Sequence, residues 1–114
     1  EVMLATLQGR LGEVKIEWHP GAAVGVVLAA DGYPGPYCKG EVITGLDKVP
    51  VGVEVFQAGT AREQGQLVTA GGRVLCATAR GESLKQALQQ AYAGAEVIHF
   101  AGKHYRRDIG WRAL

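Results

Sequence analysis

The sequence predicts an α+β domain in which a small, mostly antiparallel and barrel-like sheet packs against one helix. Three stretches of the 114 residues indicate this class. Residues 66–79 contain two apolar runs joined by Thr69-Ala70-Gly71-Gly72, a pattern typical of a β-hairpin whose glycines supply positive φ. Residues 22–30 form a continuous small and β-branched run of strand length. Residues 83–95 repeat apolar side chains at helical spacing.

Length, composition and charge limit the functional classes. A chain of 114 residues fits one domain, and 17 glycines indicate many turns. The net charge of +1 argues against a general nucleic-acid or membrane-surface binder, which needs many basic residues. No apolar run approaches the ~18 residues of a membrane span, and the first residues lack a signal-peptide pattern. We therefore expect a cytoplasmic protein without nucleic-acid or membrane partners.

Residues 1–8 are expected to be the last turns of a helix, because their apolar positions share a face and Gly9 is a stop signal. No N-cap residue precedes those positions, which is typical of a helix that begins upstream of Glu1. Residues 11–18 alternate between apolar and charged side chains and predict a half-buried strand. Its apolar positions are Val14, Ile16 and Trp18.

The next elements follow a turn at His19-Pro20-Gly21. Because residues 22–30 carry no polar side chain, we expect a central strand covered on both faces. Residues 31–37 contain two prolines, two glycines and two tyrosines, which favours a rigid, partly aromatic surface loop. A further short strand is expected at residues 53–56 after a turn at 48–52.

Residues 83–95 give the clearest helix signal. Ser83 with Gln86 three residues later forms a capping box. One apolar stripe follows and faces the sheet; it consists of Leu84, Ala87, Leu88, Ala91, Tyr92 and Ala95. The returning strand of the hairpin is expected to be covered on both faces, with this helix as one cover. A short closing strand is expected at residues 97–100.

No motif in the chain completes a catalytic or metal centre. Cys38 and Cys76 lie far apart without a His/Cys cluster, so buried free thiols are expected. Ser83 is the only serine and is needed as a helix cap. We expect His99 to be a hydrogen-bonded core residue and His19 to be solvated. The expected catalytic and metal-ligating sets are therefore empty.

The C-terminal segment, residues 102–112, is the one candidate binding site. It sets four basic residues against one acidic residue, namely Lys103, Arg106, Arg107 and Arg112 against Asp108. Guanidinium forks and an ammonium group suit a phosphate or carboxylate, and Gly110 would allow close backbone approach. The alternative is a solvated segment in which Arg106 or Arg107 pairs with an acidic residue. Alternation favours the site, because anchors would hold the arginines in place; these are Tyr105, Ile109 and Trp111.

Four blocks carry a resemblance to a known family. They are GYPGPYCKG at 32–40, VFQAGTA at 55–61, LVTAGGRVLCATARG at 67–81 and YRRDIGWRAL at 105–114. In this order they resemble the C-terminal domain of the glycinamide ribonucleotide synthetases, or phosphoribosylamine–glycine ligases. That family usually has histidine in place of Gln57 and asparagine in place of Ala70. The resemblance therefore implies no essential role for these two side chains.

The resemblance implies an ATP-grasp ligase of de novo purine synthesis. Such an enzyme joins glycine to 5-phosphoribosylamine and converts ATP to ADP and phosphate through glycyl phosphate. Mg²⁺ or Mn²⁺ would accompany ATP, bound mainly by an ATP-grasp domain before Glu1. Residues 1–114 would be the C-terminal cap domain, inactive alone, and residues 1–8 the end of a helix from that domain. The implied fold is small and barrel-like, of the barrel-sandwich or rudiment single hybrid type.

The resemblance also implies a role for the C-terminal segment, which is the basic segment of the chain (residues 102–112). Related enzymes bind a ribonucleotide phosphate near the chain end, so Arg106 and Arg107 are expected to contact the 5-phosphate, supported by Lys103 and the backbone at Gly110. The expected partners are glycine, 5-phosphoribosylamine, ATP and the ATP-grasp domain. The alternative function is a non-catalytic, barrel-type protein-interaction module with its contact surface at residues 33–37. A carrier of biotin or lipoate would need a lysine at the hairpin tip, which Gly71-Gly72 does not offer.

Overall fold

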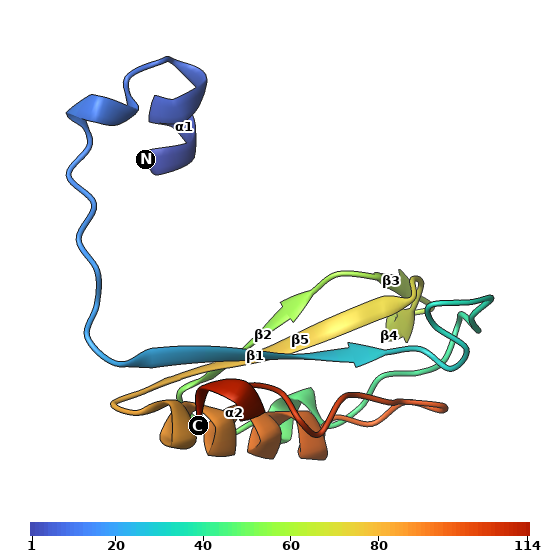
Figure 1. Cartoon of the computed structure of the whole chain (residues 1–114). Coiled ribbons are helices and arrows are strands. Elements are labelled where there is room, and N and C mark those ends of the chain that lie inside the picture. The colour runs from blue at the N-terminus through green and yellow to red at the C-terminus, as the bar shows by residue number, and fades with distance from the viewer.

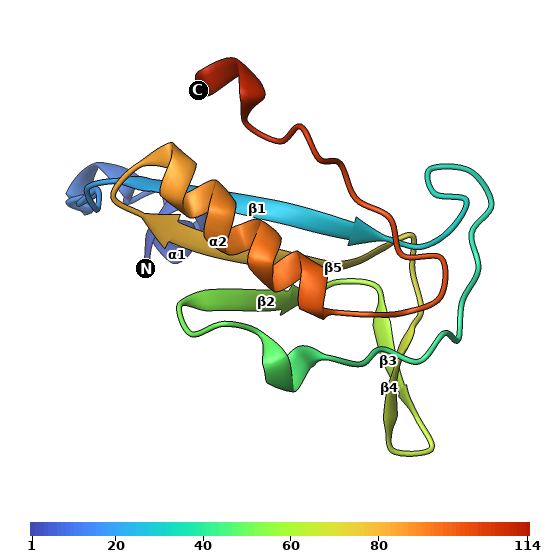
Figure 2. The ribbon, with the colours of Figure 1, turned by 90° about the horizontal axis from the view of Figure 1, so that it is seen from below.

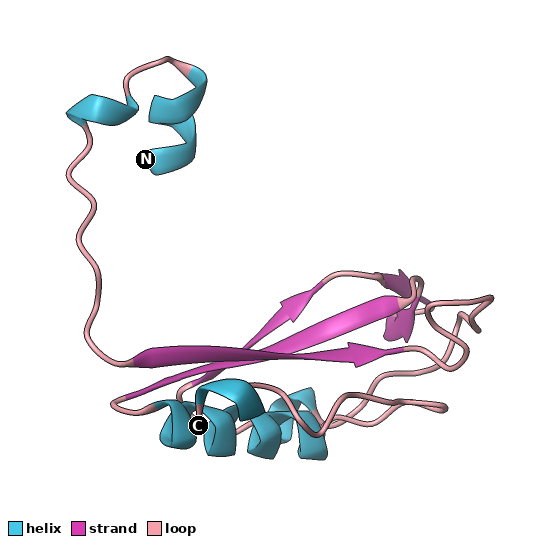
Figure 3. Ribbon diagram, viewed as in Figure 1, coloured by secondary structure: helices cyan, strands magenta, loops and turns pink.

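The core of the molecule is a three-stranded antiparallel sheet with one long helix on one face (Figures 1 and 3). The computed structural model describes all 114 residues. Strand β5 (Arg73–Gly81) lies between β1 (Ala22–Ala29) and β2 (Val53–Gln57). Helix α2 (Leu84–Val97) packs across β5 and β1. The α+β class and the antiparallel pairing are confirmed, whereas closure into a barrel stays a prediction.

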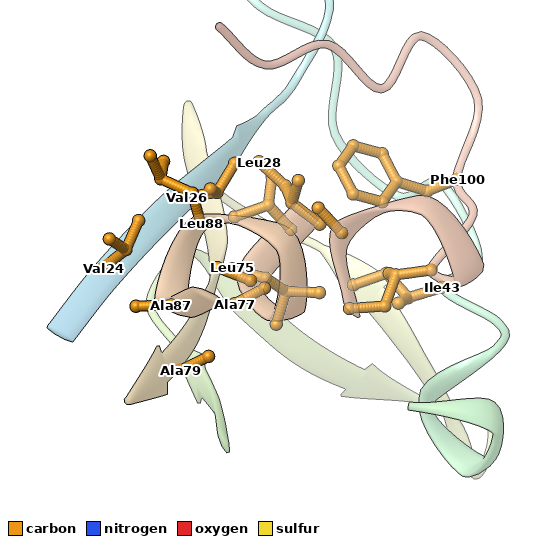
Figure 4. Packing of buried hydrophobic residues seen from close by; sticks show 14 of the residues in the cluster. Val24, Val26, Leu28, Ile43, Leu75, Ala77, Ala79, Ala87, Leu88 and Phe100 are labelled. Carbon is orange, nitrogen blue, oxygen red and sulfur yellow. The ribbon is translucent and has the colours of Figure 1, made fainter. Parts of the chain in front are cut away.

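The core lies between α2 and the sheet (Figure 4). Alternate residues of β1 and β5 point into it, and small residues on α2 let the helix approach closely. A Cβ added at Gly94, for example, would lie 2.6 Å from Cγ1 of Val53. Residues of α2 and of the sheet that are fully or almost fully buried include Val26, Leu28, Leu75, Ala77, Ala87, Ala91 and Ala95.

The start of α2 follows from its capping residues. The Oγ of Ser83 accepts a hydrogen bond from the Gln86 amide at 3.3 Å. The Gln86 side chain accepts in turn from the Glu82 amide at 2.9 Å. The predicted capping box is confirmed, with the reciprocal bond moved to the residue before the cap. The predicted stripe is also confirmed, since the buried face of α2 carries Ala87, Leu88, Ala91 and Ala95.

The predicted hairpin at residues 66–79 is wrong. Strand β4 (Gln66–Thr69) pairs with β3 (Thr60–Glu63), whereas β5 pairs with β1 and β2. The real hairpin turns at Gln64 and Gly65, whose φ angles of 49° and 81° are those of a type I′ turn. Residues 70–72 instead connect the two sheets. Gly71 lies there against Gly59, with no room for a side chain on either residue.

The strand at residues 22–30 exists but is not central, and its two faces are not both covered. Strand β1 is an edge strand in which Val24, Val26 and Leu28 are buried while Val27 is 42% exposed. The open face of β1 also carries Ala23 and Gly25, so small residues make a half-exposed strand look uniformly apolar. Coverage of both faces is also wrong for β5, since Cys76 and Thr78 on its other face remain half-buried.

The predicted strand at residues 11–18 is also wrong. Residues Leu11–Glu13 form a 3₁₀ turn, η1, and the residues that follow are extended without a pairing strand. Ile16 is 49% exposed and Trp18 is 89% exposed. Alternation alone cannot supply the hydrogen-bonding partner that a strand needs. The predicted N-terminal helix is confirmed as α1 (Val2–Leu7), which stands apart from the sheet (Figure 1).

Three other predicted elements have mixed outcomes. The loop at residues 31–37 and the strand at residues 53–56 agree with prediction, since residues 31–36 form turns and bends and β2 follows a turn at 51–52. The closing strand at 97–100 is reduced to one backbone bridge between His99 and Thr44, because α2 continues to Val97.

None of the helices combines the length and apolar character that a membrane crossing requires.

Candidate functional site

The C-terminal segment, residues 102–112, turns back after α2 and runs along the helix in the opposite direction (Figure 2). Lys103 lies at the C-terminal end of α2, Tyr105 and Ile109 lie beside Tyr92, and Gly110 lies near Leu88. This course continues from the bridge between His104 and Ala29 of β1. The basic residues are therefore carried on a segment fixed at several points and not on a free terminus.

Lys103 closes the C-terminal end of α2. Its Nζ donates a hydrogen bond to the Ala95 carbonyl at 2.9 Å and another to the Ile98 carbonyl. A cation here satisfies carbonyls that the helix leaves without partners and complements the helix dipole. Burial lowers the pKa of Lys103, the nearby Glu96 raises it, and Arg107 lowers it further. The structure thus places this predicted phosphate ligand in a helix cap.

Tyr105 and Ile109 behave as the predicted anchors, because both are half-buried and pack against the core. The prediction is wrong for Trp111, which is 58% exposed. Gly110 has a φ of 76° and turns the chain into a last 3₁₀ turn, η3 (Trp111–Ala113), away from the core. There the Arg112 guanidinium lies 5.2 Å from the Trp111 ring.

The two adjacent arginines are held in different ways. Arg106 forms a two-point pair with Asp108, with Nε 2.9 Å from Oδ1 and Nη2 2.8 Å from Oδ2. This hydrogen-bonded pair raises the pKa of Arg106 and lowers the pKa of Asp108, although both side chains are exposed. The alternative interpretation, in which an arginine pairs with Asp108, therefore holds for Arg106. Arg107 instead lies 5.1 Å above the Tyr105 ring, and its guanidinium forms no ion pair.

A cavity of about 320 Å³ lies at this segment. Its lining consists of Arg106, Asp108, Ile109, Gly110, Trp111, Arg112 and Ala113. The structure therefore brings Arg106, Gly110 and the additional basic residue Arg112 to one small hollow. Lys103 and Arg107 lie outside its lining. No three His, Cys, Asp or Glu side chains in the chain lie together in a way that could hold a metal ion.

Sequence reasoning misjudged several single residues. Cys38 and Cys76 are both free, but Cys38 is exposed. His99 is exposed because only its backbone joins the bridge to Thr44, so its predicted place in the core is wrong. The helical spacing places Tyr92 in the apolar stripe alone, whereas its hydroxyl forms hydrogen bonds with the backbone of Arg106 and Ile109 in the C-terminal segment. A tyrosine in a stripe otherwise made of alanine and leucine is the signal that could have revealed this contact.

Comparisons with known proteins agree with one another. Residues 23–112 match the sequence model of a family described as "Phosphoribosylglycinamide synthetase, C domain". The chain is 52% identical over 115 residues to the phosphoribosylamine–glycine ligase of Vibrio cholerae, covering 100% of this chain and 27% of the relative. It is 57% identical over 111 residues to that of Pseudomonas aeruginosa, covering 96% of this chain and 26% of the relative.

A solved structure shows the same similarity. The crystal structure of the phosphoribosylamine–glycine ligase of Thermotoga maritima superposes with a TM-score of 0.77 at 43% sequence identity. The match covers 95% of this chain and 27% of the Thermotoga chain. The chain thus spans about 27% of the length of the relatives that it matches.

Proposed function

Because the chain belongs to the family of the phosphoribosylglycinamide synthetase C domain, we propose that it forms the C-terminal part of a phosphoribosylamine–glycine ligase. This enzyme joins glycine to 5-phosphoribosylamine with ATP and yields glycinamide ribonucleotide, ADP and phosphate in purine biosynthesis, in the cytoplasm. The observation that carries the proposal is identity of 52% and 57% to two ligases of that name over almost the whole chain.

The metal and the nucleotide belong to a different part of the enzyme. Ligases of this family use ATP and a divalent metal, here Mg²⁺ or Mn²⁺. No three metal-binding side chains converge in this chain, so it offers no metal site made of protein ligands alone. The chemistry of the ligation is therefore assigned to an ATP-grasp domain, and the present chain supplies contacts to the substrate and closes one side of its cleft.

The contact with that ATP-grasp domain involves the N-terminal part of the chain. Met3 is 84%, Leu7 86% and Trp18 89% exposed, and large apolar side chains of this kind are typical of an interface. In this proposal α1 is the end of a helix that continues from the ATP-grasp domain. Residues 14–21, which form no strand, would be ordered by the same contact.

The basic segment binds the 5-phosphate of phosphoribosylamine in this proposal. Arg107 has an unpaired fork held over an aromatic ring, and a phosphate dianion can compete with Asp108 for the fork of Arg106. The Gly110 amide donates no hydrogen bond within the chain and is available to a phosphate oxygen. Lys103 supports the site indirectly, since it fixes the start of the segment to α2.

Kinetics of the full-length ligase test this assignment. Arg107→Ala should raise the KM for phosphoribosylamine at least about tenfold, because a lost charge-assisted contact costs about 1.5–3 kcal/mol. Arg62→Ala is the matched control, since Arg62 is an exposed arginine on β3. It should leave the same KM unchanged. An Arg107→Ala enzyme with the KM of the parent enzyme would contradict the proposed phosphate contact.

A further inference from the structure

The Tyr92 hydroxyl joins two backbone positions on either side of Arg107. Its O–H donates a hydrogen bond to the Arg106 carbonyl at 2.9 Å. The same oxygen accepts a hydrogen bond from the Ile109 amide at 3.1 Å. The hydroxyl therefore uses both its donor and an acceptor position on one short stretch of the chain, residues 106–109.

The Tyr92 ring supports the same stretch through a second set of contacts. Its centroid lies 6.1 Å from that of Tyr105, with the two planes tilted by 40°. The Tyr105 ring in turn lies under the Arg107 guanidinium at 5.1 Å. Such a cation–π contact orients a guanidinium while leaving its hydrogen-bond donors free. Tyr92 thus contacts both the backbone around Arg107 and the ring on which its side chain rests.

We propose that Tyr92 is a positioning residue for phosphate recognition, because it holds residues 106–109 and the Tyr105 ring in the conformation that presents Arg107. This inference rests on the proposed phosphate-binding role of the basic segment. A segment that is ordered in advance loses less conformational freedom when the ligand binds. Loss of the Tyr92 hydroxyl should therefore weaken binding of the phosphorylated substrate and leave the chemical step unaffected.

Asp108 lies in the same stretch and makes the positioning necessary. Its carboxylate already occupies the fork of Arg106, one residue away from Arg107. If residues 106–109 moved freely, the same carboxylate could also reach Arg107 and neutralise it. The two bonds of Tyr92 fix the backbone at both ends of Arg107-Asp108 and so keep the two arginines in different environments.

The test uses Tyr92→Phe in the full-length ligase, which removes the hydroxyl and retains the ring. The KM for phosphoribosylamine should rise about fivefold to tenfold, which corresponds to the low end of the contribution expected from two hydrogen bonds. The kcat and the KM values for glycine and ATP should stay unchanged. Tyr37→Phe is the matched control, because the Tyr37 hydroxyl has no hydrogen-bond partner and the side chain is exposed.

The double variant Tyr92→Phe/Arg107→Ala separates positioning from general stability. If Tyr92 acts through Arg107, its effect on the KM should disappear once Arg107 is absent. An effect that persists in full, or that alters all three KM values and the melting temperature together, would overturn the inference. So would an unchanged KM in Tyr92→Phe beside a raised KM in Arg107→Ala. An unchanged KM in Arg107→Ala would instead remove the proposed phosphate site, and the inference with it.

Discussion

Replacing Gly59 by alanine should strongly destabilise the chain, because the added methyl group has no space. An ideal Cβ at Gly59 would lie 2.5 Å from the Gly71 Cα, 2.7 Å from the Arg73 carbonyl oxygen and 2.8 Å from the Gly71 nitrogen. All three neighbours are backbone atoms, so no side-chain rotation can relieve the contact. The backbone between β4 and β5 would have to move instead.

That movement would disturb two hydrogen bonds. The Gly59 amide donates to the Arg73 carbonyl and the Ala70 amide donates to the Gly59 carbonyl, both at 2.8 Å. Overpacking costs about 1–3 kcal/mol, and each weakened hydrogen bond adds about 0.5–1.5 kcal/mol. We therefore expect Gly59→Ala to lower the free energy of unfolding by about 2–6 kcal/mol, a large fraction of the ~5–15 kcal/mol typical of a domain.

Urea denaturation followed by far-ultraviolet circular dichroism measures this effect. With a slope of about 1–3 kcal/mol per molar urea, the midpoint should fall by at least about 0.7 M. Gly12→Ala is the matched control, because nothing lies within 4 Å of its Cβ position and its φ is not left-handed. It should leave stability equal or slightly higher. Equal midpoints for Gly59→Ala and Gly12→Ala would refute the close contact between the β2–β3 connection, which contains Gly59, and the β4–β5 connection, which contains Gly71.

Two further predictions concern single local contacts. Ser83→Ala should lower the free energy of unfolding by about 1 kcal/mol in the same urea experiment, because the Gln86 amide loses the Ser83 hydroxyl as its hydrogen-bond acceptor. An unchanged midpoint would show that this N-cap contributes nothing to stability. The pKa of Asp108, followed by NMR, should lie below its ordinary 3.8 and return toward it in Arg106→Ala. Because the folded-state pKa is lowered, the pair stabilises the fold above about pH 4. That contribution disappears as the pH falls through the folded-state pKa, and high salt weakens it. A pKa unaffected by Arg106→Ala would contradict this pairing.

Local signals predicted the start and the buried face of α2 well, because the contacts that define them are close in sequence. The cap joins residues three positions apart, and the buried stripe repeats within the helix itself. Because these signals are local, they do not reveal the cap at the C-terminal end of the helix. Lys103 reaches the carbonyls of Ala95 and Ile98 only because the chain reverses after the helix. No pattern of apolar and polar residues encodes that reversal.

The hairpin was misassigned because its strands are polar where the competing segment is apolar. The turn at Gln64 and Gly65 joins short strands that include Arg62 and Glu63, and these polar side chains lack the apolar pattern of a strand. The apolar runs around Gly71 and Gly72 looked like hairpin strands. Their glycines serve close contact instead, since a Cβ at Gly72 would lie 2.2 Å from the Tyr33 ring. Which of the two segments, 64–65 or 71–72, makes the hairpin turn is thus decided by contacts between residues distant in sequence.

The basic segment shows the same division between local and distant information. Its composition predicted a cationic site, and its alternation predicted Tyr105 and Ile109 as anchors. The sequence could not distinguish the two arginines, because Arg106 and Arg107 are chemically identical neighbours. Arg106 pairs with Asp108 and Arg107 lies over the Tyr105 ring. The Tyr92 hydroxyl forms hydrogen bonds with the backbone of Arg106 and Ile109, 14 and 17 residues later in the chain. The proposed presentation of Arg107 to a phosphate therefore rests on a residue whose sequence pattern indicated only a place in the core.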